Sequence, residues 1–234
     1  MAKALGLLQP DSAAIIPLNP MFYNDYMPAI DITSADTVWA WITTECGSSV
    51  VGNFHLTNAK ELMEIDPVST MEKLVRAFTY ICDQKNLPNL IAFDDFIAND
   101  DRNIGNLVMV GNGDLGIIDH GEILGRIDWI SHLNTLDKNQ AFNNVLLSIL
   151  DRLPIDPKQA KFTTKNQAVV ASDQHKDAFI SIQGILLTWW KNILEISHIP
   201  ISEHQKYIDT LHEFLHYRSH QPSVYFANRI GLVA

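Results

Sequence analysis

Three side chains able to take part in phosphoryl transfer lie within residues 93–122. Asp101 is followed five positions later by Asn106, and Asp119 comes after a second short apolar run. A carboxylate can accept the proton of an attacking hydroxyl, and amide and carboxylate oxygens bind Mg²⁺ beside the phosphates of ATP. These residue types at this spacing therefore indicate a site for a hydroxyl nucleophile and Mg·ATP.

A helix and a hairpin must position these side chains. The apolar residues 90, 93 and 97 share one face of a predicted helix that ends near residues 99–100. Apolar runs at 107–110 and 115–118 flank a Gly-Asn-Gly-Asp segment, which predicts a β-hairpin. Asp119 lies where a buried strand emerges, and a charge at such a position costs free energy, which indicates that the carboxylate has a role. The alternative is that these polar residues only form turns and that Asp119 caps the next segment.

The rest of the chain predicts a small mixed N-terminal part and a helical C-terminal part. Strands are expected at 12–18, with Pro17 favouring a sheet edge, and at 38–44, whereas 50–56 forms a third strand or a loop over the cleft. Ser69 and Glu72 fit a capping box, and the helix behind them places Leu74, Phe78 and Ile81 on one face. Further helices are predicted at 128–134, 137–151, 177–197, 203–218 and 222–229, with a long polar loop at 152–176.

The run FDDFIANDDRNIGNL, together with the later GDLGIIDHGE, resembles the catalytic segment of the HipA-like kinases, a bacterial branch of the protein-kinase-like fold. Members carry F-D-x-x-x-x-N-x-D-R-x-x-x-N and then a strand that ends I-D-H-G. The matching residues here are Phe93, Asp94, Asn99, Asp101, Arg102, Asn106, Ile118, Asp119, His120 and Gly121. The opening AKALGLLQP is also similar to the segment at which these kinases leave the helix of their first lobe, so the resemblance covers residues 2–130.

The resemblance implies an α+β, protein-kinase-like fold with a mostly helical C-lobe and a small, truncated N-terminal β part. Residues 1–60 would be the remnant of the N-lobe with a hinge-like segment, and residues 61–234 would be the C-lobe. The implied activity is transfer of the γ-phosphate of ATP to a Ser or Thr hydroxyl, with ATP and Mg²⁺ as cofactors, a protein as substrate and a toxin–antitoxin setting.

Specific roles follow from the same resemblance. Asp101 would be the catalytic base, and Asn106 and Asp119 would bind Mg²⁺ and so the nucleotide. Arg102 would steady the catalytic loop, although a surface salt bridge is an equal alternative. His120 takes the place of the Phe in the Asp-Phe-Gly motif of kinases and would lie at the nucleotide site, although a lone histidine is more often packed than catalytic.

The upstream elements of such a kinase are missing from this sequence. No Gly-rich phosphate loop occurs in residues 1–46, and Lys3 is the only lysine before Lys60. Three explanations stay open: a protein partner supplies the N-lobe, the chain is a catalytically inactive kinase relative that binds a partner, or the natural chain starts earlier. Without the loop and the lysine, most of the positioning and charge stabilisation of phosphoryl transfer is lost.

A competing pattern lies near the C-terminus, where residues 212–216 read His-Glu-x-x-His. On a helix, His212 and His216 share a face and could bind Zn²⁺, with Glu213 as general base and His220 as a third ligand. No acidic residue follows Glu213 in the sequence, so a downstream carboxylate ligand is excluded. A zinc-dependent peptidase is therefore the third hypothesis, after the kinase and the interaction protein.

Composition narrows the function classes. The net charge of −10 argues against a nucleic-acid-binding face, which needs basic surface. The longest apolar stretch, 178–190, is too short to span a bilayer, and we expect no membrane association. Two cysteines without metal spacing and an N-terminus without a signal-peptide pattern predict a cytoplasmic protein.

Overall fold

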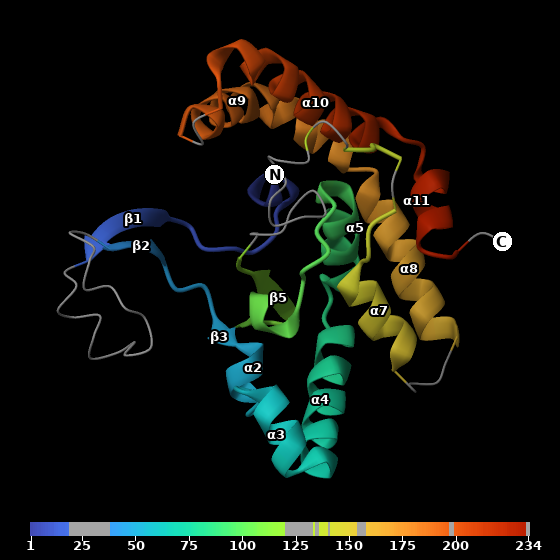
Figure 1. Ribbon diagram of the computed structural model, residues 1–234. Helices are drawn as coiled ribbons and strands as arrows, with labels where there is room; N and C mark the ends of the chain where they lie inside the picture. Colours follow the sequence, from blue (N-terminus) through green and yellow to red (C-terminus); the bar gives the residue numbers. More distant parts are fainter. Residues whose placement is uncertain are drawn as a thin grey trace.

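The computed structural model describes residues 1–18, 38–119, 133, 136–139, 141–153, 158–196 and 199–232 (Figure 1). The architecture is α+β and mostly helical, with two small antiparallel sheets, so the predicted fold class is confirmed at this coarse level. His120 and, apart from Leu133, the helix predicted for 128–134 lie outside the described residues.

The N-terminal segment runs along the edge of a sheet that forms much later in the chain. The 3₁₀ helix η1 (Ala2–Leu5) ends at Gly6, which adopts the left-handed conformation with φ 67°. Leu8 then forms a parallel bridge with Gly116, and its carbonyl accepts a hydrogen bond of 2.8 Å from the N–H of Ile117. The first residues thus lie directly against the strand that leads to Asp119.

Within the described residues, the first sheet consists of two strands. β1 (Ala13–Leu18) and β2 (Val38–Thr43) pair antiparallel, with Pro17 opposite Trp39. Both strands are edges, so the predicted edge position of Pro17 is confirmed. In Figure 1 this hairpin projects to the side of the helical body.

The second sheet has the order β3-β4-β5, formed by β3 (Ser48–Ser49), β4 (Leu107–Gly111) and β5 (Asp114–Ile117). The predicted hairpin is confirmed, and Asn112 and Gly113 in its turn have φ of 58° and 80°. The strand or loop predicted at 50–56 is wrong, because α2 (Val50–Asn53) forms there. The Ser49 hydroxyl accepts a hydrogen bond from the N–H of Gly52 and caps this short helix.

Three α-helices lie between α2 and the hairpin: α3 (Ala59–Ile65), α4 (Pro67–Cys82) and α5 (Leu87–Ile97). The capping box predicted at Ser69 is wrong, because the helix begins one turn earlier: Asp66 is the N-cap and accepts a hydrogen bond of 3.1 Å from the N–H of Ser69. The predicted face of α4 is confirmed, with Ile81 buried and its neighbours Leu74 and Phe78 packed against the core. Every residue of α5 except Asn89 is buried, so α5 is the central helix of the molecule.

The C-terminal part contains α7 (Val145–Arg152), α8 (Lys158–Ser172), α9 (His175–Ile196), α10 (Ile201–His220) and α11 (Ser223–Arg229). The helix predicted from 137 begins at Val145, because the Asn144 side chain accepts a hydrogen bond of 3.0 Å from the N–H of Leu147. The long loop predicted at 152–176 is wrong, since α8 packs against α5 and α11. The last three helices agree with the prediction within about two residues.

One hydrophobic cluster joins both predicted parts of the chain. It includes Ala2, Leu7, Val50 and Leu56 as well as the buried residues of the helices. The division at residue 60 stays a prediction. Among the described residues, no helix combines the length and the apolar character needed to cross a bilayer.

Candidate functional site

The loop that follows α5 is closed by its own asparagines. α5 ends at Ala98, which has φ 52°, and the chain turns away from the helix. Asn106 donates a hydrogen bond of 2.8 Å from Nδ2 to the carbonyl oxygen of Asp101, and the N–H of Asn103 donates to the same oxygen at 2.7 Å. The spacing of five residues between Asp101 and Asn106 is therefore the spacing at which the side chain of one reaches the backbone of the other.

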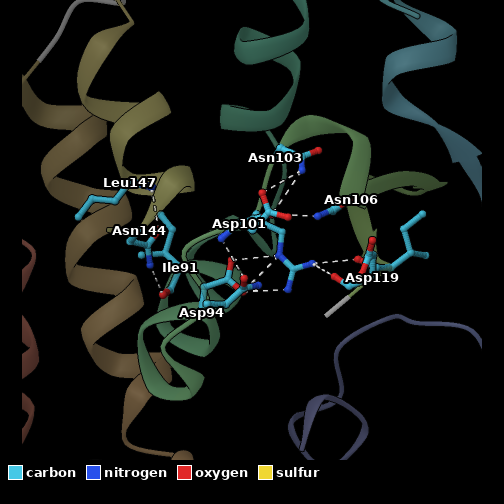
Figure 2. A network of polar contacts seen from close by, with 11 residues as sticks. Ile91, Asp94, Asp101, Asn103, Asn106, Asp119, Asn144 and Leu147 are labelled. Atoms are coloured by element: carbon cyan, nitrogen blue, oxygen red, sulfur yellow. Dashed lines mark hydrogen bonds and ion pairs between the residues drawn. The ribbon is translucent and has the colours of Figure 1, made fainter. Parts of the chain in front are cut away.

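Asp119 is held beside this loop. The N–H of Ile118 donates a hydrogen bond of 3.1 Å to the carbonyl oxygen of Asn106, so the end of β5 is tied to the end of the loop. Asp119 is exposed and has a left-handed backbone with φ 52°. The structure thus brings Asp101, Asn106 and Asp119 into one neighbourhood, as the sequence predicts (Figure 2).

Arg102 has a buried side chain that connects the two parts of the site, which are the helix-and-loop part and the segment that carries Asp119. Its side chain has no exposed surface, so the alternative of a surface salt bridge is wrong. One guanidinium nitrogen, Nη1, donates to the carbonyl oxygens of Ile118 at 3.1 Å and Asp119 at 3.3 Å. The other two nitrogens donate to the carboxylate of Asp94, with Nη2 2.9 Å from Oδ1 and Nε 3.1 Å from Oδ2. A single side chain therefore contacts α5 and the segment that carries Asp119.

Asp94 lies on the buried helix α5 and is 1% exposed. Burial raises the pKa of Asp94, and the ion pair with Arg102 and the hydrogen bond from Asn99 oppose that rise. Asn99 donates from Nδ2 to Asp94 Oδ1 at 3.0 Å and accepts from the N–H of Asp101 at 3.1 Å. The buried carboxylate therefore positions the residues on both sides of Asp101.

The bonds from Arg102 are strong enough to stabilise the unusual backbone of Asp119. A left-handed conformation costs a non-glycine residue about 1–2 kcal/mol. A hydrogen bond to a charged group contributes about 1.5–3 kcal/mol. The two bonds from Arg102 to the carbonyls of Ile118 and Asp119 are thus sufficient to offset this cost.

The hairpin itself is anchored to the loop between α4 and α5. Asn86 donates from Nδ2 to the carbonyl oxygen of Leu115 at 2.7 Å, and its Oδ1 accepts from the N–H of Leu115 at 2.9 Å. This amide pairs with the outer edge of β5 as a neighbouring strand would. Leu8 binds the next residues along the same edge. β5 is therefore held along its length, and this fixes the point from which the chain continues to Asp119.

A pocket of about 660 Å³ opens beside this segment. This volume lies in the range of small-molecule sites. Its lining comes from the N-terminal segment, the β1–β2 hairpin and the end of β5: Gln9, Pro10, Ala13, Thr43, Ile117, Ile118 and Asp119. None of these lining residues is basic, so within the described part of the chain the pocket offers an anion no side-chain positive charge.

The His-Glu-x-x-His pattern lies on α10, far along the chain from this pocket. The rings of His212 and His216 stack with centroids 5.7 Å apart, and those of His216 and His220 with centroids 4.0 Å apart. Glu213 is paired with Lys138, and Nδ1 of His220 lies 2.8 Å from the carbonyl oxygen of His216. Among the described residues, no three His, Cys, Asp or Glu side chains are placed to hold a metal ion together. The geometry gives the zinc hypothesis no support.

A second buried acidic residue of α5 was not singled out from the sequence. Asp95 binds Arg229 through both carboxylate oxygens, at 3.0 and 2.7 Å, and lies 3.4 Å from Nη2 of Arg218. His175 stacks on Phe96 beside this group, and burial lowers its pKa to about 4. The signal in the sequence was the pair of aspartates inside an otherwise apolar helix, because each buried charge needs a partner.

Comparison with protein-family models, curated proteins and solved structures found no match for this chain. The resemblance to HipA-like kinases therefore stays a prediction from the sequence motif.

Proposed function

We propose that this chain is the C-lobe of a HipA-like, protein-kinase-like phosphotransferase. It would transfer the γ-phosphate of ATP to a Ser or Thr hydroxyl with a partner polypeptide that supplies the ATP-gripping N-lobe. The observation that carries the proposal is the joining of Asp101, Asn106 and Asp119 through Arg102 and the backbone bond from Ile118 to Asn106. A set of turn residues without a shared role needs no buried arginine to hold it together.

The donor atoms fit Mg²⁺. Asn106 uses its amide nitrogen to bind the backbone of Asp101, which leaves its amide oxygen as the ligand, and Asp119 offers a carboxylate. Mg²⁺ is usually held by one or two protein oxygens together with phosphates and waters. Bound there, the ion would neutralise charge on the phosphates of ATP.

In the proposed function, Asp101 acts as the general base for the substrate hydroxyl. Its carboxylate is half-buried, and its Oδ1 lies 3.3 Å from Nδ2 of Asn103. Its backbone is held from both sides, by Asn99 at the N–H and by Asn106 at the carbonyl. A base fixed in this way contributes to catalysis by positioning the hydroxyl, which is most of what phosphoryl transfer requires.

The second candidate is a catalytically inactive interaction protein derived from a kinase. The absence of basic side chains among the described pocket residues favours it, because ATP carries several negative charges. The two functions differ in whether the site binds nucleotide in a metal-dependent manner.

Calorimetric titration of the chain with ATP, with and without Mg²⁺, tests the proposal. We expect micromolar binding with Mg²⁺ and much weaker but measurable binding without it, and we expect Asp119→Asn to abolish the gain from Mg²⁺ because one negative ligand is lost. Asp114→Asn, at the other end of β5, is the matched control and should bind as the wild type does. Wild-type binding that Asp119→Asn leaves unchanged would remove the assignment of the metal ligand. No binding of Mg·ATP by the wild type, even with a partner that supplies an N-lobe, would favour the interaction protein.

A further inference from the structure

Arg102 and Asp94 form a buried unit that touches both halves of the proposed site. Arg102 follows Asp101 directly in the chain, and its Nη1 binds the carbonyl oxygens of Ile118 and Asp119, which belong to the two peptide groups on either side of the Cα of Asp119. Neither side chain of the pair reaches the surface, so neither is available to bind substrate or solvent.

A buried ion pair of this kind is not explained by stability alone. Removing two charges from water is costly, and apolar side chains of similar volume often give equal or greater stability at such a position. The contacts that an apolar pair could not replace are those from the guanidinium to the two carbonyl oxygens. These contacts fix the direction of the peptide groups around Asp119, whose φ of 52° is rare for a residue with a side chain.

We propose that Asp94 and Arg102 are positioning residues, whose ion pair holds Asp119 in its left-handed conformation beside the Asp101–Asn106 loop and so sets the direction of its carboxylate. This inference rests on the proposed function, in which Asp119 binds Mg²⁺. Asp94 acts on Arg102, Arg102 acts on the backbone of residues 118–119, and neither touches the nucleotide.

The neighbouring residue on α5 supplies a matched control. Asp95 is also a buried carboxylate paired with arginine, but its partners Arg229 and Arg218 lie on the C-terminal helices and not in the site. Asp95→Asn therefore removes the same charge from the same helix and a comparable ion pair. The two variants differ in what the lost contacts lead to: those of Asp94 lead to the site, and those of Asp95 lead to the C-terminal helices.

The measurement is the ratio of the dissociation constants for ATP without and with Mg²⁺, obtained by calorimetry. We expect Asp94→Asn to reduce this ratio at least tenfold, with metal-free binding of ATP unchanged, and Asp95→Asn to leave the ratio as in the wild type. Loss of general stability would change both constants or neither, so the ratio separates positioning from folding. A folded Asp94→Asn variant with the wild-type ratio would overturn the inference.

Two additional measurements keep the inference decidable. If Asp94→Asn does not fold, the double variant Asp94→Leu with Arg102→Met removes both charges, and we expect a folded protein with the tenfold loss in the ratio. A ratio equal to that of the wild type would refute the positioning role.

If the wild type binds no Mg·ATP, the proposed function fails first. The backbone NMR shifts of Ile118 and Asp119 then decide the inference alone, since they should change in Asp94→Asn and stay constant in Asp95→Asn.

Discussion

Replacing Asn86 by Asp should destabilise the protein although both residues are equally good helix N-caps. Asn86 occupies the N-cap position of α5, but its side chain makes no capping hydrogen bond. It binds the backbone of Leu115 instead, with one donor and one acceptor. An aspartate keeps the acceptor and loses the donor, so a carboxylate oxygen would face the carbonyl oxygen that now lies 2.7 Å from Asn86 Nδ2.

The size of the effect follows from the environment of Leu115, whose side chain has no exposed surface. A buried carbonyl left without a hydrogen bond costs about 1–3 kcal/mol. We therefore expect Asn86→Asp to lower the free energy of unfolding by about 2 kcal/mol, which is roughly 4–8 °C in Tm for a chain of this length. Asn86→Ala loses both bonds and should cost at least as much.

Thermal and urea unfolding, followed by circular dichroism, measure this difference. Asn89→Ala is the control, because Asn89 is the exposed residue of the same helix and should change the unfolding free energy by less than about 0.5 kcal/mol. If Asn86→Asp were as stable as the wild type while Asn86→Ala lost about 1 kcal/mol, the side chain would act as a helix cap. Our account of how β5 is anchored would then be wrong.

Three other predictions concern groups outside the proposed site. Burial lowers the pKa of His175 from 6.5 to about 4, so the folded state keeps this side chain neutral; its contribution to stability is complete above pH 6.5 and is lost as the pH falls towards 4. The wild type should therefore lose about 3 kcal/mol of unfolding free energy over this range, and His175→Gln should lose less. Equal pH dependence of stability in both proteins would contradict this assignment to His175. Asp66→Ala should cost about 1 kcal/mol and Ser69→Ala less than half of that in urea unfolding, whereas a capping box at Ser69 would reverse the order. Elemental analysis should find no stoichiometric zinc in the purified protein; one zinc per chain that is lost in His216→Ala would restore the peptidase hypothesis.

Local signals in the sequence predicted the elements that carry the site. The Gly-Asn-Gly-Asp turn fixes its own hairpin, because Asn112 and Gly113 adopt positive φ easily. The helices α9, α10 and α11 follow from apolar periodicity. By contrast, α8 has no strong apolar face: Ala168 is its one fully buried residue among those described, and Phe162 and Val170 are exposed. Its packing against α5 decides its structure, and no local pattern reports that contact.

The burial of Arg102 could have been predicted, and the partners of Asp95 could not. Asp94 lies eight residues before Arg102, in a helix that is mostly apolar, so a nearby cation was the expected partner. Arg218 and Arg229 lie more than a hundred residues from Asp95, and only the packing of the C-terminal helices on α5 brings them there. Motif spacing gives the residues of a site, whereas long-range packing determines which of them are held rigid.

The charge of the site indicates what a completing partner would contribute under the proposed function. The chain has a net charge of −10, and the pocket presents the carboxylate of Asp119 without a basic residue among its described lining. Like charges disfavour binding of free ATP, so in the proposed function the metal ion would be the counter-charge that this chain recruits by itself. A partner that completes the site should therefore present lysine or arginine towards the pocket, and its effect should be to increase the affinity for ATP in the absence of Mg²⁺. A partner that leaves metal-free binding unchanged would act on another surface.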